Sequence, residues 1–98
     1  MLKKQVLKTK PVTKVTFELP EAIKAETAHL VGDFNDWDES ATPMNRLKSG
    51  RFTVTLELET GQEYQFRYLV NGTEWHNDWH ADRYVPNPFS GDNSVVAA

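Results

Sequence analysis

Hydrophobic and polar residues alternate along much of this chain, and that pattern predicts strands with one buried and one exposed face. The alternation is clearest over residues 12–20, 51–59 and 63–70. In the first of these segments Val15 and Phe17 point to one side, while the polar residues beside them point to the other. We therefore expect a strand in each segment.

Two shorter segments also have the β pattern, one between the first two long strands and one at the end of the sequence. Residues 27–31 alternate until Gly32 interrupts them, and the closing residues 93–98 have the composition of a final strand. Asn71 and Gly72 follow the third long strand, and Asn-Gly between β-forming residues is the strongest short signal for a hairpin. Six or seven short strands without a long helical window predict an all-β fold, an antiparallel β-sandwich of the immunoglobulin-like type.

Three segments fall between the predicted strands. Residues 20–27 contain helix-compatible side chains, but the segment is short and begins with Pro, so we expect a loop or short turn. Two longer connections run over residues 35–50 and 77–91. Loops longer than about 12 to 15 residues are uncommon in compact domains and are usually functional or disordered. Tryptophan residues in these two connections favour function over disorder.

Length and charge place the chain among ordinary globular domains. Its 98 residues suffice for one domain, which we expect at residues 12–98, preceded by a flexible N-terminal arm at residues 1–11. The formal net charge is -3, and no basic stripe with interleaved aromatic residues follows the lysines of the arm. Nucleic-acid binding therefore has little support.

The lack of cysteine and of long apolar runs excludes several further classes of function. The chain has no cysteine, which excludes disulfides, thiolate nucleophiles and Cys-ligated zinc. Its apolar runs are only a few residues long, well short of the roughly 20 that a membrane-spanning helix needs, and no signal-peptide-like apolar region follows the first lysines. We therefore expect a cytoplasmic location and no membrane partner.

All three tryptophans, Trp37, Trp75 and Trp79, lie in or beside the two long connections rather than inside the alternating strands. A pyranose ring has flat C–H faces rimmed by hydroxyls, so a sugar site needs an aromatic plate next to side chains that form hydrogen bonds. Polar residues such as Asn35 and His76 stand close to these tryptophans. The alternative is that each tryptophan caps the end of the sandwich core, as one buried Trp often does in such folds.

Three motifs, in this order along the chain, carry a resemblance to a known family. They are VGDFNDW at residues 31–37, GRFTVTLELETGQEYQFRYLVNG at residues 50–72 and EWHNDWHADRYVPNPFSGDNSVV at residues 74–96. Together they resemble the early-set domains of the family 48 carbohydrate-binding modules. Such domains stand at the N-terminus of isoamylases and glycogen branching enzymes, and form the glycogen-binding domain of the β subunit of AMP-activated protein kinase. The resemblance covers about residues 12–96 and implies an early-set sandwich.

The resemblance also implies a set of sugar-binding residues. In glycogen-binding members one Trp follows the Gly-x-Phe-Asn-x stretch, which corresponds to Trp37, and a second Trp follows the hairpin Gly, which is matched most closely by Trp75. A basic residue on the strand before the hairpin contacts the sugar, and Arg67 has that position. A polar residue just before the last strand bonds sugar hydroxyls, and Asn93 has that position.

The chain departs from the family pattern at two places. The hairpin Gly and Trp75 are one residue farther apart than in the kinase-subunit type, and side chains alternate between faces of a strand. A two-residue hairpin would pair Val70 with Thr73, and Tyr68 would then face Trp75, away from Arg67. The second departure is Trp79, which stands where the family often has Pro, and which could serve as the second aromatic plate.

We expect no catalytic activity and no cofactor. Glycoside hydrolysis needs two carboxylates with different pKa values across a cleft, and the candidates all lie in one loop: Asp33, Asp36, Asp38 and Glu39. Crowded carboxylates in a surface loop are usually solvated charges. The chain is also too short to include the barrel that carries catalysis in the branching and debranching enzymes it resembles.

A metal site at His76 and His80 is equally weakly supported. Their i, i+4 spacing near Asp78 and Asp82 would suit two ligands on a helix. These residues instead lie in a Pro-flanked segment without helical periodicity, and the sequence indicates no third ligand. We expect ordinary polar loop histidines and no bound metal.

Two functions remain open. The first is a noncatalytic module that binds an α-glucan: glycogen, starch or a maltooligosaccharide. The second is an early-set interaction or scaffold domain that has lost sugar binding and docks onto an enzyme of glycogen or starch metabolism. One exposed face shared by Trp37, Arg67 and a second Trp favours the first function, whereas buried tryptophans favour the second.

Overall fold

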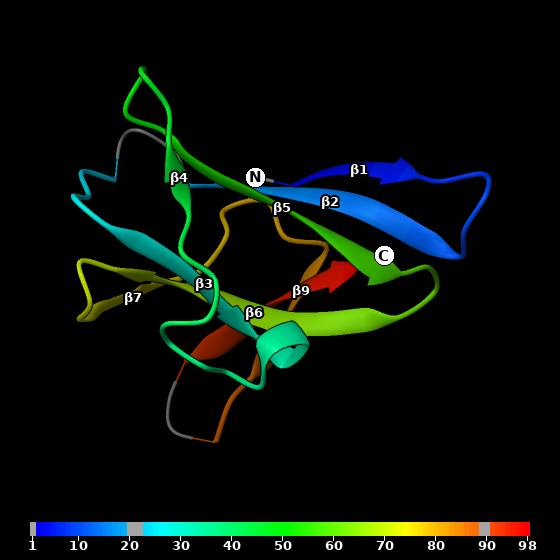
Figure 1. The fold of residues 1–98 in the computed structure, drawn as a ribbon. Coiled ribbons are helices and arrows are strands. Elements are labelled where there is room, and N and C mark those ends of the chain that lie inside the picture. Colours follow the sequence, from blue (N-terminus) through cyan, green and yellow to red (C-terminus); the bar gives the residue numbers. More distant parts are fainter. Residues whose placement is uncertain (1, 20–22, 89–90) are drawn as a thin grey trace.

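Two antiparallel sheets pack face to face in the computed structural model, which describes residues 2–19, 23–88 and 91–98 (Figure 1). The first sheet has the order β1-β2-β5-β4, with β1 at Leu2–Val6, β2 at Val12–Leu19, β5 at Phe52–Glu59 and β4 at Asn45–Arg46. The second has the order β3-β6-β9-β8, with β3 at Ala28–Gly32, β6 at Glu63–Val70, β9 at Asp92–Ala97 and β8 at Arg83–Pro86; β7 at Glu74–His76 also pairs with β6. This architecture confirms the predicted immunoglobulin-like, early-set β-sandwich.

The core lies between the sheets and is formed by the inward positions of the strongly alternating strands. Val15 and Phe17 of β2 face Phe66 and Tyr68 of β6, and all four have no exposed surface. The Phe66 ring meets both neighbouring rings edge to face, with centroids 5.0 Å from Phe17 and 5.6 Å from Tyr68. Such aromatic pairs stabilise beyond the area they bury. The period-two pattern therefore identified the three long strands because one face of each enters this core.

The residues expected to form a flexible arm instead contain an edge strand. β1 pairs with β2 from Leu2 opposite Phe17 to Val6 opposite Thr13. Four of its five side chains are exposed, so the strand lacks the burial pattern that reveals the others. Its lysines form ion pairs: the Lys4 Nζ atom lies 2.6 Å from a carboxylate oxygen of Asp82.

A second lysine of β1 helps to hold a buried carboxylate. The Glu18 side chain on β2 is only 5% exposed, and its oxygens lie 3.0 Å from the Lys3 Nζ atom and 3.2 Å from the Arg51 guanidinium. The hydrogen bond from Lys3, followed by the charges of both cations, holds the pKa of Glu18 below its ordinary value despite burial.

The two long connections contain short pairings that their sequence did not reveal. The first includes β4 and a single bridge between His29 and Pro43, and the second includes β8. In the segment predicted as a loop or short turn, residues 20–22 lie outside the described residues, and residues 23–27 form no helix or strand. The first connection is therefore tied to the first sheet through β4 and to the second sheet through Pro43, whereas β8 ties the second connection to the second sheet.

The hairpin between β6 and β7 has a three-residue turn rather than a two-residue one. Val70 pairs with Glu74 and Leu69 with Trp75, which leaves Thr73 as the extra turn residue after Asn71 and Gly72. The two central residues have φ of 53° and 74°, which Asn and Gly adopt most readily. The pairing of Val70 with Thr73 is thus wrong, and Trp75 lies on the face of Leu69 and Arg67.

Candidate functional site

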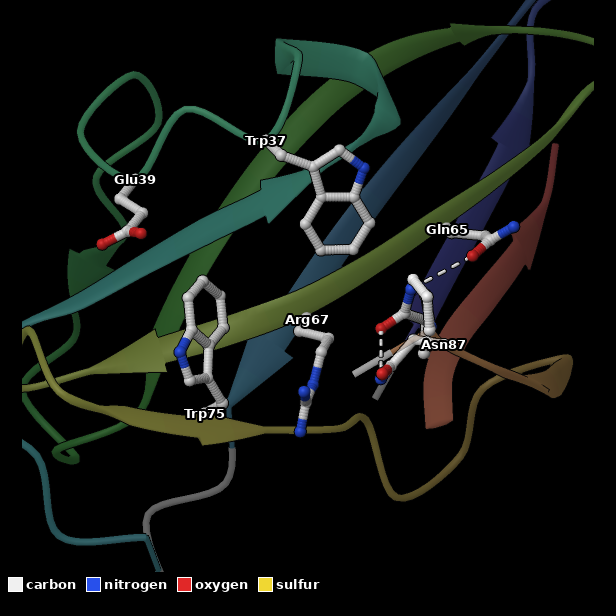
Figure 2. Close-up of a pocket in the computed structure, with 8 residues that line it drawn as sticks. Trp37, Glu39, Gln65, Arg67, Trp75 and Asn87 are labelled. Atoms are coloured by element: carbon white, nitrogen blue, oxygen red, sulfur yellow. Dashed lines mark hydrogen bonds between the residues drawn. The ribbon is translucent and has the colours of Figure 1, made fainter. Parts of the chain in front are cut away.

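A hollow of about 600 Å³ lies on the outer face of the second sheet (Figure 2). The strands β6, β7 and β9 and the two long connections supply the residues that line it: Trp37, Glu39, Gln65, Arg67, Trp75, Asn87, Pro88 and Asn93. Gln65 and Arg67 alternate on β6 with Phe66 and Tyr68 of the core, so they point away from it. The structure thus brings together four of the predicted residues on one face.

Apolar residues support the hollow on the same outer face of the sheet. Val31, Leu69 and Val95 are at most 3% exposed, although none belongs to the core cluster between the sheets. In the strand register they lie opposite Arg67, Trp75 and Gln65 respectively. We call these three residues the apolar floor.

The loop that presents Trp37 begins where β3 passes unusually close to β6. A Cβ atom on Gly32 would lie 2.5 Å from the Gln65 carbonyl oxygen and 2.8 Å from the Phe66 Cβ, so only glycine fits there without a shift. The 3-10 turn η1 at Asp33–Asn35 follows directly. Gly32 therefore lets the loop leave the sheet beside Gln65.

The end of this turn has a backbone conformation that bulky residues rarely adopt. Asp36 and Trp37 have φ of 55° and 57°, and the Trp37 N–H donates to the Gly32 carbonyl at 2.9 Å. The Asn35 side chain closes the turn, because its oxygen accepts from the Gly32 N–H at 3.0 Å and its nitrogen donates to the Leu30 carbonyl at 2.9 Å. Strained residues of this kind cluster at functional sites.

A carboxylate fixes the Trp37 ring to the neighbouring strand. The indole Nε1–H donates to Asp33 Oδ1 at 2.9 Å, and the Gln65 main-chain N–H donates to Asp33 Oδ2 at 2.7 Å. A carboxylate accepts at both oxygens, and such charge-assisted bonds are stronger than neutral ones. Asp33 thus orients the aromatic plate, and we call this pair of bonds the Asp33 clamp.

The second aromatic plate, Trp75, lies beside Arg67. Among the described residues, Arg67 is the one cationic side chain that lines the hollow. Trp75 is 39% exposed, and the Arg67 guanidinium carbon lies 5.9 Å from its ring centroid. That separation allows a cation–π contact. Figure 2 shows both side chains at the hollow, with Trp37 across from them.

Three side-chain amides form the polar wall of the hollow. Asn87 Nδ2 donates to Asn93 Oδ1 at 3.3 Å, and Asn93 Nδ2 donates to Gln65 Oε1 at 3.1 Å (Figure 2). Sequence reasoning missed Gln65, although its position two residues before Arg67 on one strand places both on one face. It also missed Asn87 and Pro88, and considered Glu39 only as a loop carboxylate, because the path of their connections cannot be read from local pattern.

Comparison with known proteins identifies the family of this chain. The family profile of carbohydrate-binding module 48 (isoamylase N-terminal domain) matches residues 9–87. The chain belongs to this family. A 1,4-alpha-glucan branching enzyme GlgB of Aquifex aeolicus (strain VF5) is 34% identical over 91 residues, which is 85% of this chain and 14% of the enzyme. A GlgB of Butyrivibrio fibrisolvens is 31% identical over 64 residues, 65% of this chain and 10% of that enzyme. The chain thus spans a small fraction of these relatives.

Trp79 of this family 48 module does not line the hollow. Its neighbour Asp78 is 2% exposed and accepts from the Tyr68 hydroxyl at 2.7 Å, while its main-chain N–H donates to Ser94 Oγ at 2.9 Å. Burial, with the nearby Asp78 charge, raises the pKa of Tyr68 well above its ordinary value, so the hydroxyl stays a donor. With Asp78 anchored inside, Trp79 is 56% exposed, and its contact with sugar stays a prediction.

Two loop carboxylates of the module, Asp33 and Asp38, have ordinary hydrogen-bond partners. Asp33 forms the clamp, and Asp38 accepts from the main-chain N–H and the hydroxyl of Ser40, which lower its pKa. Among residues 2–19, 23–88 and 91–98, no group of three or more His, Cys, Asp or Glu side chains could hold a metal ion. No helix in that described part is long and apolar enough to cross a membrane.

Proposed function

We propose that this family 48 module is a noncatalytic domain that binds an α-glucan, such as glycogen, starch or a maltooligosaccharide, in the hollow on its second sheet. The observation that carries the proposal is the shared exposed face of Trp37, Trp75 and Arg67, next to the amide wall. The names of the two branching enzymes, which act on 1,4-α-glucan, support the choice of sugar.

The chemistry of the hollow suits a short stretch of sugar chain. Each indole offers a flat apolar surface to the C–H face of a glucose ring, while Arg67 and Asn93 offer hydrogen bonds to its hydroxyls. Its volume of about 600 Å³ lies within the range of small-molecule sites, about 300 to 1,000 Å³. Because so small a contact buries little area, we expect a Kd between about 1 μM and 1 mM, or about -8 to -4 kcal/mol.

A second candidate function is docking onto an enzyme of glycogen or starch metabolism. One observation favours it: Trp79 is 56% exposed and lies outside the hollow, where it could contact another protein. The exposure of Trp75 at the hollow favours the sugar-binding proposal over a domain whose tryptophans only support its core.

An NMR titration of the ¹⁵N-labelled protein with maltoheptaose tests the proposal. We expect saturable shifts of the Trp37 and Trp75 indole N–H signals, and no such shifts with glucose or cellohexaose. The variants Trp37→Ala and Trp75→Ala should each lose binding by at least about tenfold, the size of one lost stacking contact. Trp79→Ala tests the remaining predicted plate: because Trp79 does not line the hollow, we expect this variant to bind normally, and weaker binding would instead support a contact between Trp79 and the sugar.

Two results would count against the proposal. If maltoheptaose causes no shift at about millimolar to tens of millimolar concentrations, well above the expected Kd, the module does not bind this glucan. If maltoheptaose is cleaved or transferred during incubation with the pure protein, the module is not noncatalytic.

A further inference from the structure

We propose that Gln65 is a positioning residue for sugar binding: together with Asn87 it holds the Asn93 amide in one orientation toward the hollow. This inference rests on the proposed function and adds a residue that acts through another rather than as an aromatic plate or a charge. It is carried by the two hydrogen bonds of the polar wall, which meet at Asn93.

The hydrogen-bonding capacity of Asn93 is only half used within the described part of the chain. A side-chain amide has two N–H donors and two acceptor lone pairs. One N–H of Asn93 binds Gln65 Oε1, and one lone pair accepts from Asn87 Nδ2. Asn93 is 9% exposed and lines the hollow, so the second N–H and the second lone pair are left for a ligand there.

One donor and one acceptor side by side suit two hydroxyls of the same sugar ring. A hydroxyl donates one hydrogen bond and accepts others, so one hydroxyl can accept from the Asn93 N–H while its neighbour donates to the Asn93 oxygen. A reversed amide would present the two groups in the opposite order. The orientation of Asn93 therefore decides which arrangement of hydroxyls the wall can bind.

Both neighbours of Asn93 enforce the same orientation. Gln65 presents an oxygen, which can only accept, and Asn87 presents an NH₂ group, which donates. If the Asn93 amide rotated by half a turn while Gln65 and Asn87 kept their orientations, it would place oxygen against oxygen at Gln65 and NH₂ against NH₂ at Asn87. Groups that are largely buried and lose their hydrogen bonds in this way are strongly disfavoured.

The side chain of Gln65 can be changed without disturbing the other wall of the hollow. Its main-chain N–H, not its side chain, donates to Asp33 in the clamp that orients Trp37. A substitution at position 65 therefore removes the contact with Asn93 while the Asp33 clamp keeps its partners. The Trp37 indole N–H signal reports whether this condition is met.

The test compares five variants by maltoheptaose titration. Gln65→Met has a similar length but no acceptor, and we expect its Kd to rise by about 3- to 10-fold, the effect of one neutral hydrogen bond. Gln65→Glu keeps an oxygen for the Asn93 N–H and should bind within about twofold of the unmodified protein. Asn93→Ala should bind more weakly, and the double variant with Gln65→Met should bind no more weakly than Asn93→Ala alone. Gln62→Met, an exposed change in the turn before β6, is the matched control.

The outcomes separate this inference from the proposed function. Loss of affinity in Gln65→Met, rescue in Gln65→Glu and coupling to Asn93 support the positioning role, particularly if the Asn93 side-chain amide signals shift and the Trp37 signal does not. Full affinity in Gln65→Met, failure of Gln65→Glu to restore binding, or additive losses in the double variant would overturn the inference while the unmodified protein still binds. Failure of the unmodified protein to bind maltoheptaose would overturn the proposed function, and the inference with it.

Discussion

The Asp33 clamp provides a direct test of whether the Trp37 plate is held ready for sugar before the sugar arrives. The carboxylate accepts from the Trp37 indole and from the Gln65 main chain, at 2.9 and 2.7 Å. In Asp33→Asn the side chain keeps one oxygen and gains an NH₂ group, so one of these two donors loses its acceptor. The Trp37 ring is then no longer joined to β6 by a continuous pair of bonds.

The size of the effect follows from the bond that is lost. A hydrogen bond to a charged group contributes about 1.5 to 3 kcal/mol, and we take about 1 to 2 kcal/mol here because Asp33 is exposed. If the Trp37 ring must be ordered again when sugar binds, the free energy of the lost hydrogen bond is subtracted from the binding free energy. The Kd for maltoheptaose then rises by about 5- to 30-fold.

Isothermal titration calorimetry measures this change, and NMR follows the Trp37 indole N–H signal in the same samples. Asp36→Asn is the matched control, because it makes the same charge change in the same loop, at a residue whose φ of 55° Asn also tolerates. We expect Asp36→Asn to bind normally. If Asp33→Asn binds as tightly as Asp36→Asn while its indole signal has moved, the plate does not need the clamp and the reasoning is wrong.

Three further predictions concern stability. Gly32→Ala should lower the free energy of unfolding by about 1 to 3 kcal/mol in urea titrations, because its Cβ would overlap atoms of β6; an unchanged midpoint would contradict the close approach. Since the hydrogen bond from Lys3 and the charges of Lys3 and Arg51 lower the pKa of Glu18, its contribution to stability should be fully present above its ordinary pKa of 4.5 and be lost as the pH falls further, so Glu18→Gln should show a shallower loss of stability in that acid range; equal slopes would refute this. Tyr68→Phe should cost about 1 to 3 kcal/mol in thermal unfolding because it removes a buried donor to Asp78, whereas a neutral effect would show that this bond adds nothing to stability.

The parts of the fold that the sequence predicted are those where one face of a strand enters the core. β2, β5 and β6 show this alternation because their inward side chains pack between the sheets. β1 lies at an edge and exposes most of its side chains, so pairing with β2 leaves no period-two trace in its sequence. Short strands such as β4 and β8 depend on main-chain hydrogen bonds and on contacts far apart in the chain, which local pattern does not record.

The candidate site likewise contains residues that could be predicted from the sequence and residues that could not. The resemblance to family 48 modules led to Trp37, Arg67, Trp75 and Asn93, which share the hollow. The sequence alone could not decide the face of Trp75, because one turn residue more or less reverses it, and only the pairing of Leu69 with Trp75 settles the register. The partners that orient the site, Asp33 among them, act through contacts between segments that are distant in sequence.

The apolar floor gives the second sheet buried apolar side chains on its outer face as well as on its inner face. Val31, Leu69 and Val95 stay buried although they face away from the core, so the segments that build the hollow also shield them from water. A variant that deletes the Trp37 loop would expose this floor and invite self-association. Sugar affinity can therefore be removed safely by replacing single side chains, whereas trimming the loop would damage folding and binding together.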